Sequence, residues 1–584
     1  MNIDGQPALG QSDVARMIDR LNRAMAKDEH ALSGYRQPKA ALMLETLRAI
    51  DALFCSKLLT GETLSDTAAM ERGLSSWGCN AALALVMPER LLGGSYEGHP
   101  SHPGVQAQAD DLLFRCGTLA SARRVTGWLK QGLATASLVS VESLDDTGPR
   151  EVLEVTPDAP TLWDEGIGLA GLSWEAERLA RRGGRDTRRL EREHRVILPE
   201  LTAGVTDWMG WGLSATTSSA VDAHFMDWAR LHLEGMYGRD LLDPEDRIGG
   251  RSFSAYVEVL TALCARGQRH LAHASILARA RPELDLRNLL TTWSERTGFI
   301  DQLAGFLDGD RAEVEDILQD LTLSPASASA HLSSDQAAWA PIVQVHEQVL
   351  FLPLYGLETN PFTFLMRALR TRFEREWFQI ANTRERRWGG ELTALFDGPR
   401  WTAYGEPLIL RDGKRVVTDI DFAVHDKKDN ILLLFQLKWQ HPVFGDDRAR
   451  RSACANLVAE GCKWVSAVTN WLEKHGVAAL QARLSLGSLP EAPKMELIVI
   501  GRYAAHFTGS APQDARAHWA DWANFRHARL EGDERSLRRL LAALDRRLAG
   551  ARRAKRTESL LFPVADLAVA VNAPRTPQGY RSKA

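Results

Sequence analysis

Cysteine is scarce in this chain, with six thiols scattered through 584 residues. No two of them form a CxxC pair, and no set of cysteines and histidines has the spacing of a zinc site. So few scattered thiols fit a reducing compartment, where they serve mainly as small buried apolar side chains. We therefore expect a cytoplasmic protein without a thiol-based zinc site.

Long apolar runs are also missing. No stretch reaches the roughly 18 apolar residues that a membrane-spanning helix needs, so we expect no membrane partner. Residues 1–11 lack the basic patch and apolar run of a secretory signal. The net charge of −4 gives no overall sign of nucleic-acid binding, so any such surface has to be local.

The motifs of several common enzyme classes are absent. There is no GxxxxGK[ST] phosphate loop, so we expect no P-loop ATPase or helicase activity. There is no HExxH pair for a zinc hydrolase and no GxSxG turn for a serine hydrolase. Whatever chemistry the chain performs must come from another arrangement.

The first part of the chain has the periodicity of helices. The segment 14–21 places apolar residues at i, i+3, i+4 and i+7, which is one face of an amphipathic helix, and similar patterns recur to about residue 323. We expect a mainly α-helical region at 1–325 that could act as a sensor or specificity module. It could also hold a protein partner or a second copy of the chain.

Segments rich in proline, glycine or serine mark the breaks. The loop 98–104 carries His99 and His102, which we interpret as part of a rigid surface turn rather than a metal site. A second break at 147–160 divides the helical region into two possible subdomains. The small, uncharged segment 324–330 is the best candidate for a linker.

Beyond the linker, at 336–584, short β-type runs alternate with helical ones, which predicts an α/β domain. The order is α-β-β-β-α-β over a core at 384–502. The expected elements are a helix at 384–396, strands at 407–410, 415–425 and 431–439, a helix at 448–474 and a strand at 496–501.

Polar residues interrupt two of these strands. Because side chains alternate along a strand, Asp419 and Asp421 share one face, and Gln436 and Lys438 share one face of the next strand. Polar side chains closing an otherwise apolar strand are costly unless they are paired or near the sheet end. The carboxylates would supply that pairing, and a hard divalent cation would also suit these oxygen atoms.

The pattern resembles the PD-(D/E)xK (restriction-endonuclease-like) superfamily. Its hallmark is an acidic residue at a strand end followed by (E/Q)-x-K on the next strand. Here the match is Thr418-Asp419-Ile420-Asp421 and Gln436-Leu437-Lys438, and the Gln-x-Lys form is similar to that of Mrr-type endonucleases. The sequence departs from the commonest pattern in two ways, with Ile420 before the aspartate and neutral Gln436 in place of a carboxylate.

The resemblance implies a metal-dependent DNA endonuclease, such as those of prokaryotic restriction or anti-phage defence. Mg²⁺ or Mn²⁺ would be the cofactor, and Lys438 would orient the attacking water or stabilise the developing charge. The implied catalytic residues are Asp421, Gln436, Lys438 and Glu391. The implied metal ligands are Asp421, Gln436, the Leu437 carbonyl, Glu391 (with Glu385 as runner-up) and Asp419 as a possible second ligand.

Other interpretations stay open. The nuclease-like part could be a catalytically inactive member that holds nucleic acid or a protein partner as a scaffold. Alternatively, the helical half could be the functional part of an interaction scaffold. The sequence does not distinguish DNA from RNA as a partner.

Basic residues gather near the predicted core. Residues 526–583 contain 14 Lys and Arg against six Asp and Glu, which fits either a phosphate-binding stripe or a solvated helix face. The candidate nucleic-acid-binding residues are Arg448, Arg450, Arg451, Arg538, Arg539, Arg546, Arg547, Arg552 and Arg553.

Overall fold

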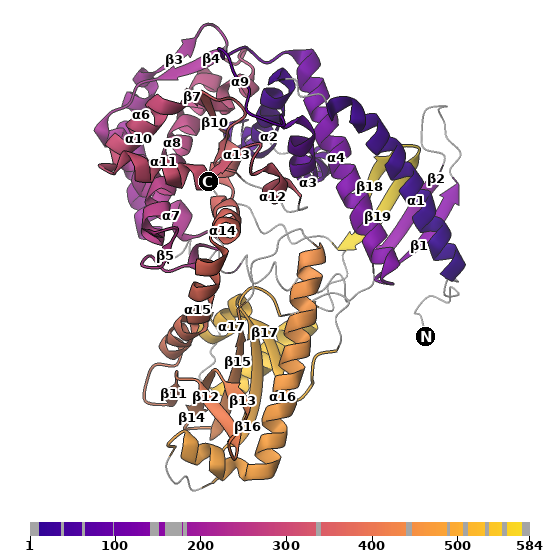
Figure 1. Ribbon diagram of the computed structural model, residues 1–584, viewed down its shortest axis with the longest axis vertical. Coiled ribbons are helices and arrows are strands. Elements are labelled where there is room, and N and C mark those ends of the chain that lie inside the picture. Colours follow the sequence, from indigo (N-terminus) through magenta and orange to yellow (C-terminus); the bar gives the residue numbers. More distant parts are fainter. Residues whose placement is uncertain are drawn as a thin grey trace.

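The computed structural model has helices through the first half of the chain and mixed sheets in the second half (Figure 1). This confirms the expectation of a mainly helical first part followed by an α/β part. Among the residues that the structure describes, no helix is long and apolar enough to cross a membrane. The described residues are 11–36, 40–60, 65–96, 98–140, 151–157, 174, 178, 184–236, 238–333, 340–439, 447–486, 491–505, 512–531, 536–551 and 557–574.

A first group of helices packs around one apolar core. It consists of α1 (Gln11–Leu32), η1 (Ser33–Arg36), α2 (Ala40–Thr60), α3 (Asp66–Val86) and α4 (Pro103–Lys130). Helices α3 and α4 approach closely where Gly78 and Gly117 face the partner backbone, and a Cβ at either position would collide with a backbone carbonyl. Buried Leu47, Leu83 and Leu112 fill the space between the helices.

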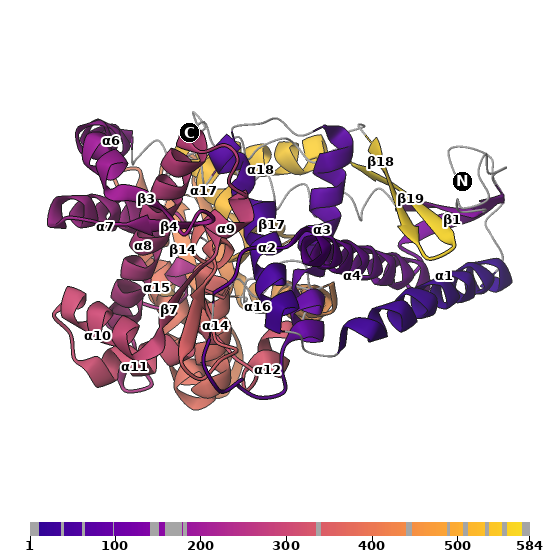
Figure 2. The ribbon, with the colours of Figure 1, turned by 90° about the horizontal axis from the view of Figure 1, so that it is seen from above.

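Two pairs of strands far apart in the sequence form a four-stranded sheet of order β1-β2-β19-β18. Its strands are β1 (Ala134–Ser140), β2 (Glu151–Pro157), β18 (Thr557–Val564) and β19 (Leu567–Pro574). Figure 2 shows this sheet beside α1, and Lys27 of α1 pairs with Asp566 at 2.9 Å. The last hairpin therefore belongs with the first helical group, and the expected domain at 336–584 does not form one unit to its end.

A second group of helices surrounds α8, whose Phe253, Tyr256 and Leu263 are fully buried. The helices are α6 (Gly184–Gly204), α7 (Ser219–Glu234), η2 (Arg239–Leu241), α8 (Phe253–Ala280), α9 (Leu286–Leu290), α10 (Arg296–Leu307) and α11 (Arg311–Asp320). Two short hairpins accompany them, β3 (Val205–Trp208) with β4 (Gly212–Ala215) and β5 (Arg247–Ile248) with β6 (Arg251–Ser252).

The predicted linker at 324–330 lies within the fold. It connects β8 (Thr322–Leu323) to α12 (Ala328–Leu332), and the chain then returns to the same sheet as β9 (Ile342–Val343) and β10 (Val349–Leu352) beside β7 (Thr292–Glu295). Since strands on both sides of the segment share one sheet, the domain boundary expected there is wrong.

The helical part and the last sheet are instead connected by one helix, α15 (Glu374–Leu395; Figure 1). After α13 (Leu354–Glu358) and α14 (Pro361–Arg372), α15 buries Trp377 in the second helical core. Three turns later, the same helix buries Trp388 against the sheet that follows.

That sheet has five strands in the order β11-β14-β15-β16-β17. The strands are β11 (Trp401–Tyr404), β14 (Phe422–Asp426), β15 (Ile431–Lys438), β16 (Lys494–Gly501) and β17 (His518–Asp521). The first three are antiparallel, and β15, β16 and β17 are parallel. A separate hairpin is formed by β12 (Leu408–Asp412) and β13 (Arg415–Ile420).

Helices cover both faces of this sheet. Leu432 and Leu434 of β15 pack in one core with Val465 of α16 (Asp447–Arg483), whereas Leu433 and Leu437 face the core on the other side. That second core includes residues of α15, α17 (Trp522–Glu531) and α18 (Leu537–Ala551). Helices and strands lie near the positions expected for 384–502, but the order differs: β11 was not expected, and the strand expected at 415–425 is divided between β13 and β14.

Candidate functional site

Asp421 lies where the chain leaves the β12–β13 hairpin and enters the five-stranded sheet. It occupies the position between β13 and β14, and its backbone N–H donates to the carbonyl of Phe435 at 3.1 Å. Only 8% of Asp421 is exposed. A carboxylate buried this deeply needs hydrogen-bond donors in place of water.

Two donors from β15 supply that need. The backbone N–H of Leu437 donates to Asp421 Oδ2 at 2.7 Å, and the Gln436 amide Nε2 donates to the same oxygen. Gln436 is itself 5% exposed. The structure therefore brings together Asp421 and Gln436, two of the residues singled out from the sequence.

Lys438 continues the face of β15 that Gln436 occupies, because strand side chains alternate. Its Nζ lies 3.2 Å from Glu460 Oε2 on α16, and about a quarter of the lysine side chain is exposed. Glu460 was missed from the sequence: it lies within the predicted helix 448–474, but the helical pattern alone did not show that it faces Lys438.

The oxygen atoms near Asp421 could contribute to a cation site. The Leu437 N–H points toward Asp421, and the N–H and C=O of one strand residue face the same neighbouring strand. The Leu437 carbonyl therefore lies on the Asp421 side, and the Gln436 amide brings a further oxygen. This set holds one carboxylate, and no three His, Cys, Asp or Glu side chains in the described part of the chain are grouped to hold a metal. It fits Mg²⁺ only with water and substrate oxygens completing the shell.

Glu391 is not part of the Asp421 group. Its carboxylate forms an ion pair with Arg502 at 3.0 Å. On α15 it follows Trp388 by three residues, and Trp388 packs on the sheet face opposite to Gln436 and Lys438. The structure thus pairs Glu391 with Arg502, and its expected role in the metal site stays a prediction; the side chain of Glu385 lies outside the described residues.

Arg502 forms a buried ion-pair cluster with Glu391 and Asp240, which we call the Arg502 joint. Only 4% of its side chain is exposed, and it also pairs with Asp240 of η2. Burial opposes its charge, but Asp240 and Glu391 outweigh that effect and hold the pKa of Arg502 above its ordinary value. The guanidinium carbon lies 5.3, 4.6 and 5.4 Å from the ring centroids of Trp388, Trp439 and Trp522.

Asp419 lies apart from Asp421. It is exposed on β13, and its backbone carbonyl accepts a hydrogen bond from Trp464 Nε1 at 2.7 Å. The expected common face is lost because β13 pairs only with β12, whereas the chain after Asp421 joins the larger sheet. The role of Asp419 as a second metal ligand is not supported by this geometry.

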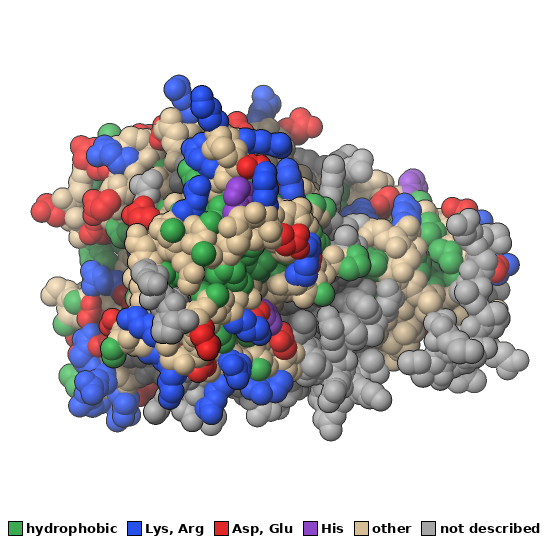
Figure 3. Space-filling model, turned by 90° about the horizontal axis from the view of Figure 1, so that it is seen from below, with side chains coloured by type: hydrophobic (Ala, Val, Ile, Leu, Met, Phe, Trp, Pro, Cys, Tyr) green, Lys and Arg blue, Asp and Glu red, His purple; other side chains and the backbone are tan. Residues whose placement is uncertain are grey.

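The predicted nucleic-acid-binding arginines are described only in part. Arg538, Arg539 and Arg546 are exposed on α18, which packs its leucines on the sheet face away from Gln436 and Lys438. On the face in Figure 3, Lys and Arg side chains occur in several groups, with acidic and hydrophobic side chains between them. The other predicted positions, Arg448, Arg450, Arg451, Arg547, Arg552 and Arg553, have side chains outside the described residues.

Comparisons of this chain with protein-family models, with curated proteins and with solved structures find no match.

Proposed function

We propose that this protein is a metal-dependent nuclease that hydrolyses phosphodiester bonds of DNA at the Asp421 site. The observation that carries the proposal is the grouping of Asp421, Gln436 and the Leu437 backbone, with Lys438 on the same face of β15 as Gln436. Such a group joins a buried carboxylate, two neutral oxygens and one ammonium at the carboxyl end of β15, the central strand of the sheet.

Each residue has a role in this proposal. Asp421, the Gln436 amide oxygen and the Leu437 carbonyl would hold Mg²⁺ or Mn²⁺, which lowers the pKa of a bound water and neutralises charge on the phosphate. Gln436 would have to turn its amide oxygen, instead of its nitrogen, toward the cation. Lys438 would leave its ion pair with Glu460 and contact the substrate instead. Its ammonium would then orient the attacking water or stabilise the negative charge of the transition state.

Cleavage of supercoiled plasmid tests the proposal. The full chain is incubated with plasmid and Mg²⁺ or Mn²⁺, with EDTA in a parallel reaction, and the nicked and linear products are measured. Asp421→Asn should abolish metal-dependent cleavage, whereas Asp419→Asn should retain it because Asp419 is exposed and apart from the site. Cleavage by Asp421→Asn at the parent rate would refute the site.

A second candidate function is a nuclease-like scaffold that binds nucleic acid without cutting it. The contact of Lys438 with Glu460 and the single carboxylate at the site favour this alternative. Binding of labelled duplex DNA and of RNA of the same sequence is measured beside cleavage. If a nucleic acid binds and neither metal supports hydrolysis, the scaffold function replaces the nuclease.

A further inference from the structure

A cavity of about 490 Å³ lies within the helical part, far in sequence from the Asp421 site. Its walls come from α2, α8, the β3–β4 hairpin and the segment that joins α9 to β7. This volume is within the range of small-molecule sites, which are commonly found between packed substructures.

The charged side chains that line the cavity have one sign. Arg48, Arg266 and Arg269 line it together with His270 and His273, and the described residues of its lining include no aspartate or glutamate. Burial lowers the pKa of both histidines to about 4, so they are neutral near pH 7 and available as hydrogen-bonding groups. The cavity is therefore suited to an anion.

Among the three arginines of the lining, Arg266 is the best candidate to bind an anion. It is partly buried on α8, donates to Ser294 Oγ at 3.0 Å and lies 5.0 Å from the centroid of the Phe299 ring. Its described contacts include no carboxylate, and burial lowers its pKa. A guanidinium that is desolvated without a counter-ion gains from an anionic ligand. Arg269 differs, because Asp222 already pairs with it.

Two buried atoms in the lining lack a hydrogen-bond partner among the described residues. They are Nε of Arg48 and Nε2 of His273, and both side chains belong to residues that are 2% exposed. Arg48 keeps its other nitrogens on Glu45 and on the carbonyl of His99. Buried polar atoms are rarely left unsatisfied, so these atoms point to a ligand or to water in the cavity.

Tryptophans form the apolar part of the lining. Trp208 lies 4.9 Å from Trp211 and 6.4 Å from Trp293 between ring centroids, in both cases edge to face. All three are partly exposed and line the cavity. Indole rings offer surfaces on which a planar heterocycle can stack, as bases stack on aromatic side chains in nucleic-acid complexes.

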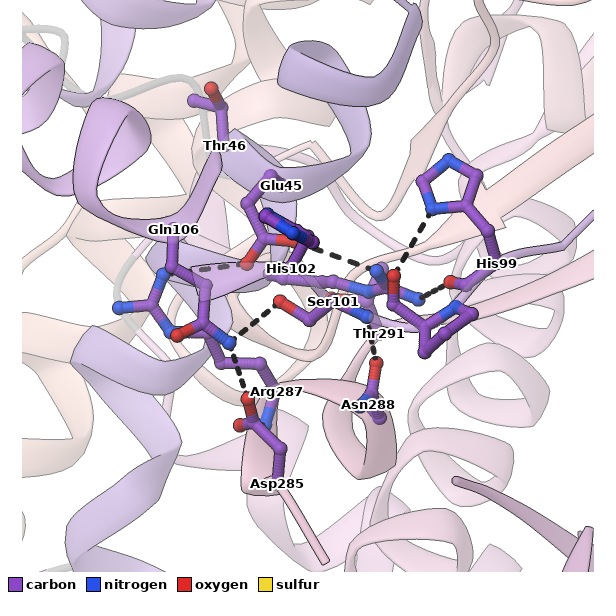
Figure 4. Close-up of polar contacts among 12 residues, drawn as sticks. Glu45, Thr46, His99, Ser101, His102, Gln106, Asp285, Arg287, Asn288 and Thr291 are labelled. Atoms are coloured by element: carbon purple, nitrogen blue, oxygen red, sulfur yellow. Dashed lines mark hydrogen bonds and ion pairs between the residues drawn. The ribbon is translucent and has the colours of Figure 1, made fainter. Parts of the chain in front are cut away.

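A polar network joins α2, α4 and α9 beside the cavity (Figure 4). Ser101 N–H donates to Asn288 Oδ1 at 2.7 Å, and Gln106 of α4 donates to Ser101 Oγ at 2.8 Å. Arg287 of α9 pairs with Glu45 of α2, so α2, α4 and α9 are linked. His102 accepts from Gly104 N–H at 3.2 Å as the cap of α4, in keeping with a structural turn.

We propose that this cavity binds a nucleotide. Its phosphate lies on Arg266 with help from Arg48 and His273, and its base lies against the tryptophans. An inorganic anion would use the cationic groups alone, and an uncharged nucleoside would use the tryptophans alone. The combination of both kinds of group in one cavity is what selects a nucleotide, and the inference is independent of the nuclease proposal.

Calorimetry with the full chain, without DNA or added metal, tests the inference. The probes are AMP, GMP, CMP, UMP and the corresponding triphosphates, each compared with its nucleoside and with pyrophosphate. At least one nucleotide should bind at least about tenfold more tightly than both its nucleoside and pyrophosphate. Absence of binding by every nucleotide at millimolar concentration would overturn the proposal. It would also be overturned if pyrophosphate bound as tightly as the tightest-binding nucleotide.

Variants locate the site. Arg266→Gln should weaken the bound nucleotide at least about tenfold, Arg266→Lys should recover part of the loss, and Trp211→Leu should weaken the nucleotide without changing pyrophosphate binding. Arg279→Gln is the matched control, since Arg279 lies exposed on the same helix outside the cavity. Circular dichroism confirms that each variant is folded, and unchanged affinity in a folded Arg266→Gln would place the ligand elsewhere.

Discussion

At the scale of single residues, Asp421 shows how a buried carboxylate is kept in a sheet. It receives the Gln436 amide and the Leu437 N–H, so its burial is compensated within β15. The same two donors fix the carboxylate at the point where the chain changes sheets. Any reaction at this site therefore begins from a carboxylate that is already oriented.

Lys438 is the residue whose loss should affect the reaction most directly. If it stabilises charge in the transition state, Lys438→Ala should lower the cleavage rate by about 10²–10³, since one such donor typically contributes that much. Single-turnover plasmid cleavage with saturating Mg²⁺ measures the effect. Lys463→Ala is the control, because Lys463 is exposed on α16. Equal rates for Lys438→Ala and the parent would remove Lys438 from the mechanism.

Gln436→Glu tests the charge of the site. The change places a second carboxylate beside Asp421, so the two repel until a cation joins them. Calorimetry with Mn²⁺ should show roughly tenfold tighter binding, and the melting temperature should fall without metal and recover with it. Gln481→Glu adds the same charge on α16 as a control. Weaker binding by Gln436→Glu would mean that residue 436 does not contact the cation.

At the scale of elements, the sequence predicted most of the strands and helices of the 384–502 segment because their patterns are local, but it did not predict β11. The apolar run 431–438 and the helix after it required no knowledge of distant residues. The break between β13 and β14 at Asp421 was not predictable in this way. The sequence pattern continues through Asp421, but β13 pairs with β12 whereas β14 pairs with β15.

The candidate site was predictable to the same extent. Asp421 and Gln436 meet because neighbouring strands bring them together, which strand order implied. The ion pairs of Glu391 with Arg502 and of Glu460 with Lys438 were not predictable, because they depend on how α15 and α16 pack on the sheet through buried residues such as Trp388 and Trp464. The hairpin 557–574 pairs with a strand more than 400 residues earlier, which no local pattern reveals.

Helix α2 is held by a buried acid that should make stability depend on pH. Asp51 accepts from Thr291 Oγ1 at 2.6 Å and from Tyr355 N–H at 2.8 Å, so it joins α2 to two other segments. Burial raises the pKa of Asp51 to about 7. The folded state then binds this proton more tightly than the unfolded state, so its contribution to stability is lost as the pH rises from about 4 to 7.

Asp51→Asn should remove that part of the pH dependence, because its Oδ1 still accepts from Tyr355 N–H and its Nδ2, in place of Oδ2, can donate to Thr291 Oγ1. Urea unfolding at pH 5 and pH 8 measures the free energy of unfolding of parent and variant. The parent should lose more stability than the variant between these two values. Glu358, whose pKa burial also raises to about 7, is unchanged in both proteins and cancels in the comparison. An identical fall in both proteins would contradict the shifted pKa of Asp51.

At the scale of the whole molecule, α15 and the Arg502 joint connect the helical part to the five-stranded sheet. Arg502 follows β16, Glu391 lies on α15, and Asp240 lies on η2 of the helical part. The three tryptophans around the guanidinium exclude water from it. The orientation of the sheet relative to the helices therefore depends on a charge that is buried between them.

Asp240→Asn should loosen this joint without unfolding either side. The variant leaves Arg502 buried with Glu391 as its remaining acidic partner, which is unfavourable for a desolvated guanidinium. Because the Asp240 side chain is 43% exposed, the free energy of unfolding is expected to fall by about 1–2 kcal/mol rather than by the full effect of a buried pair.

Hydrogen exchange followed by mass spectrometry should show faster exchange in η2, at the end of β16 and in the second half of α15. Asp301→Asn, which removes the exposed ion pair with Arg311, serves as the control and should leave these segments unchanged. Equal exchange in Asp240→Asn and the parent would show that apolar packing of the tryptophans, and not the ion pair, joins the two parts.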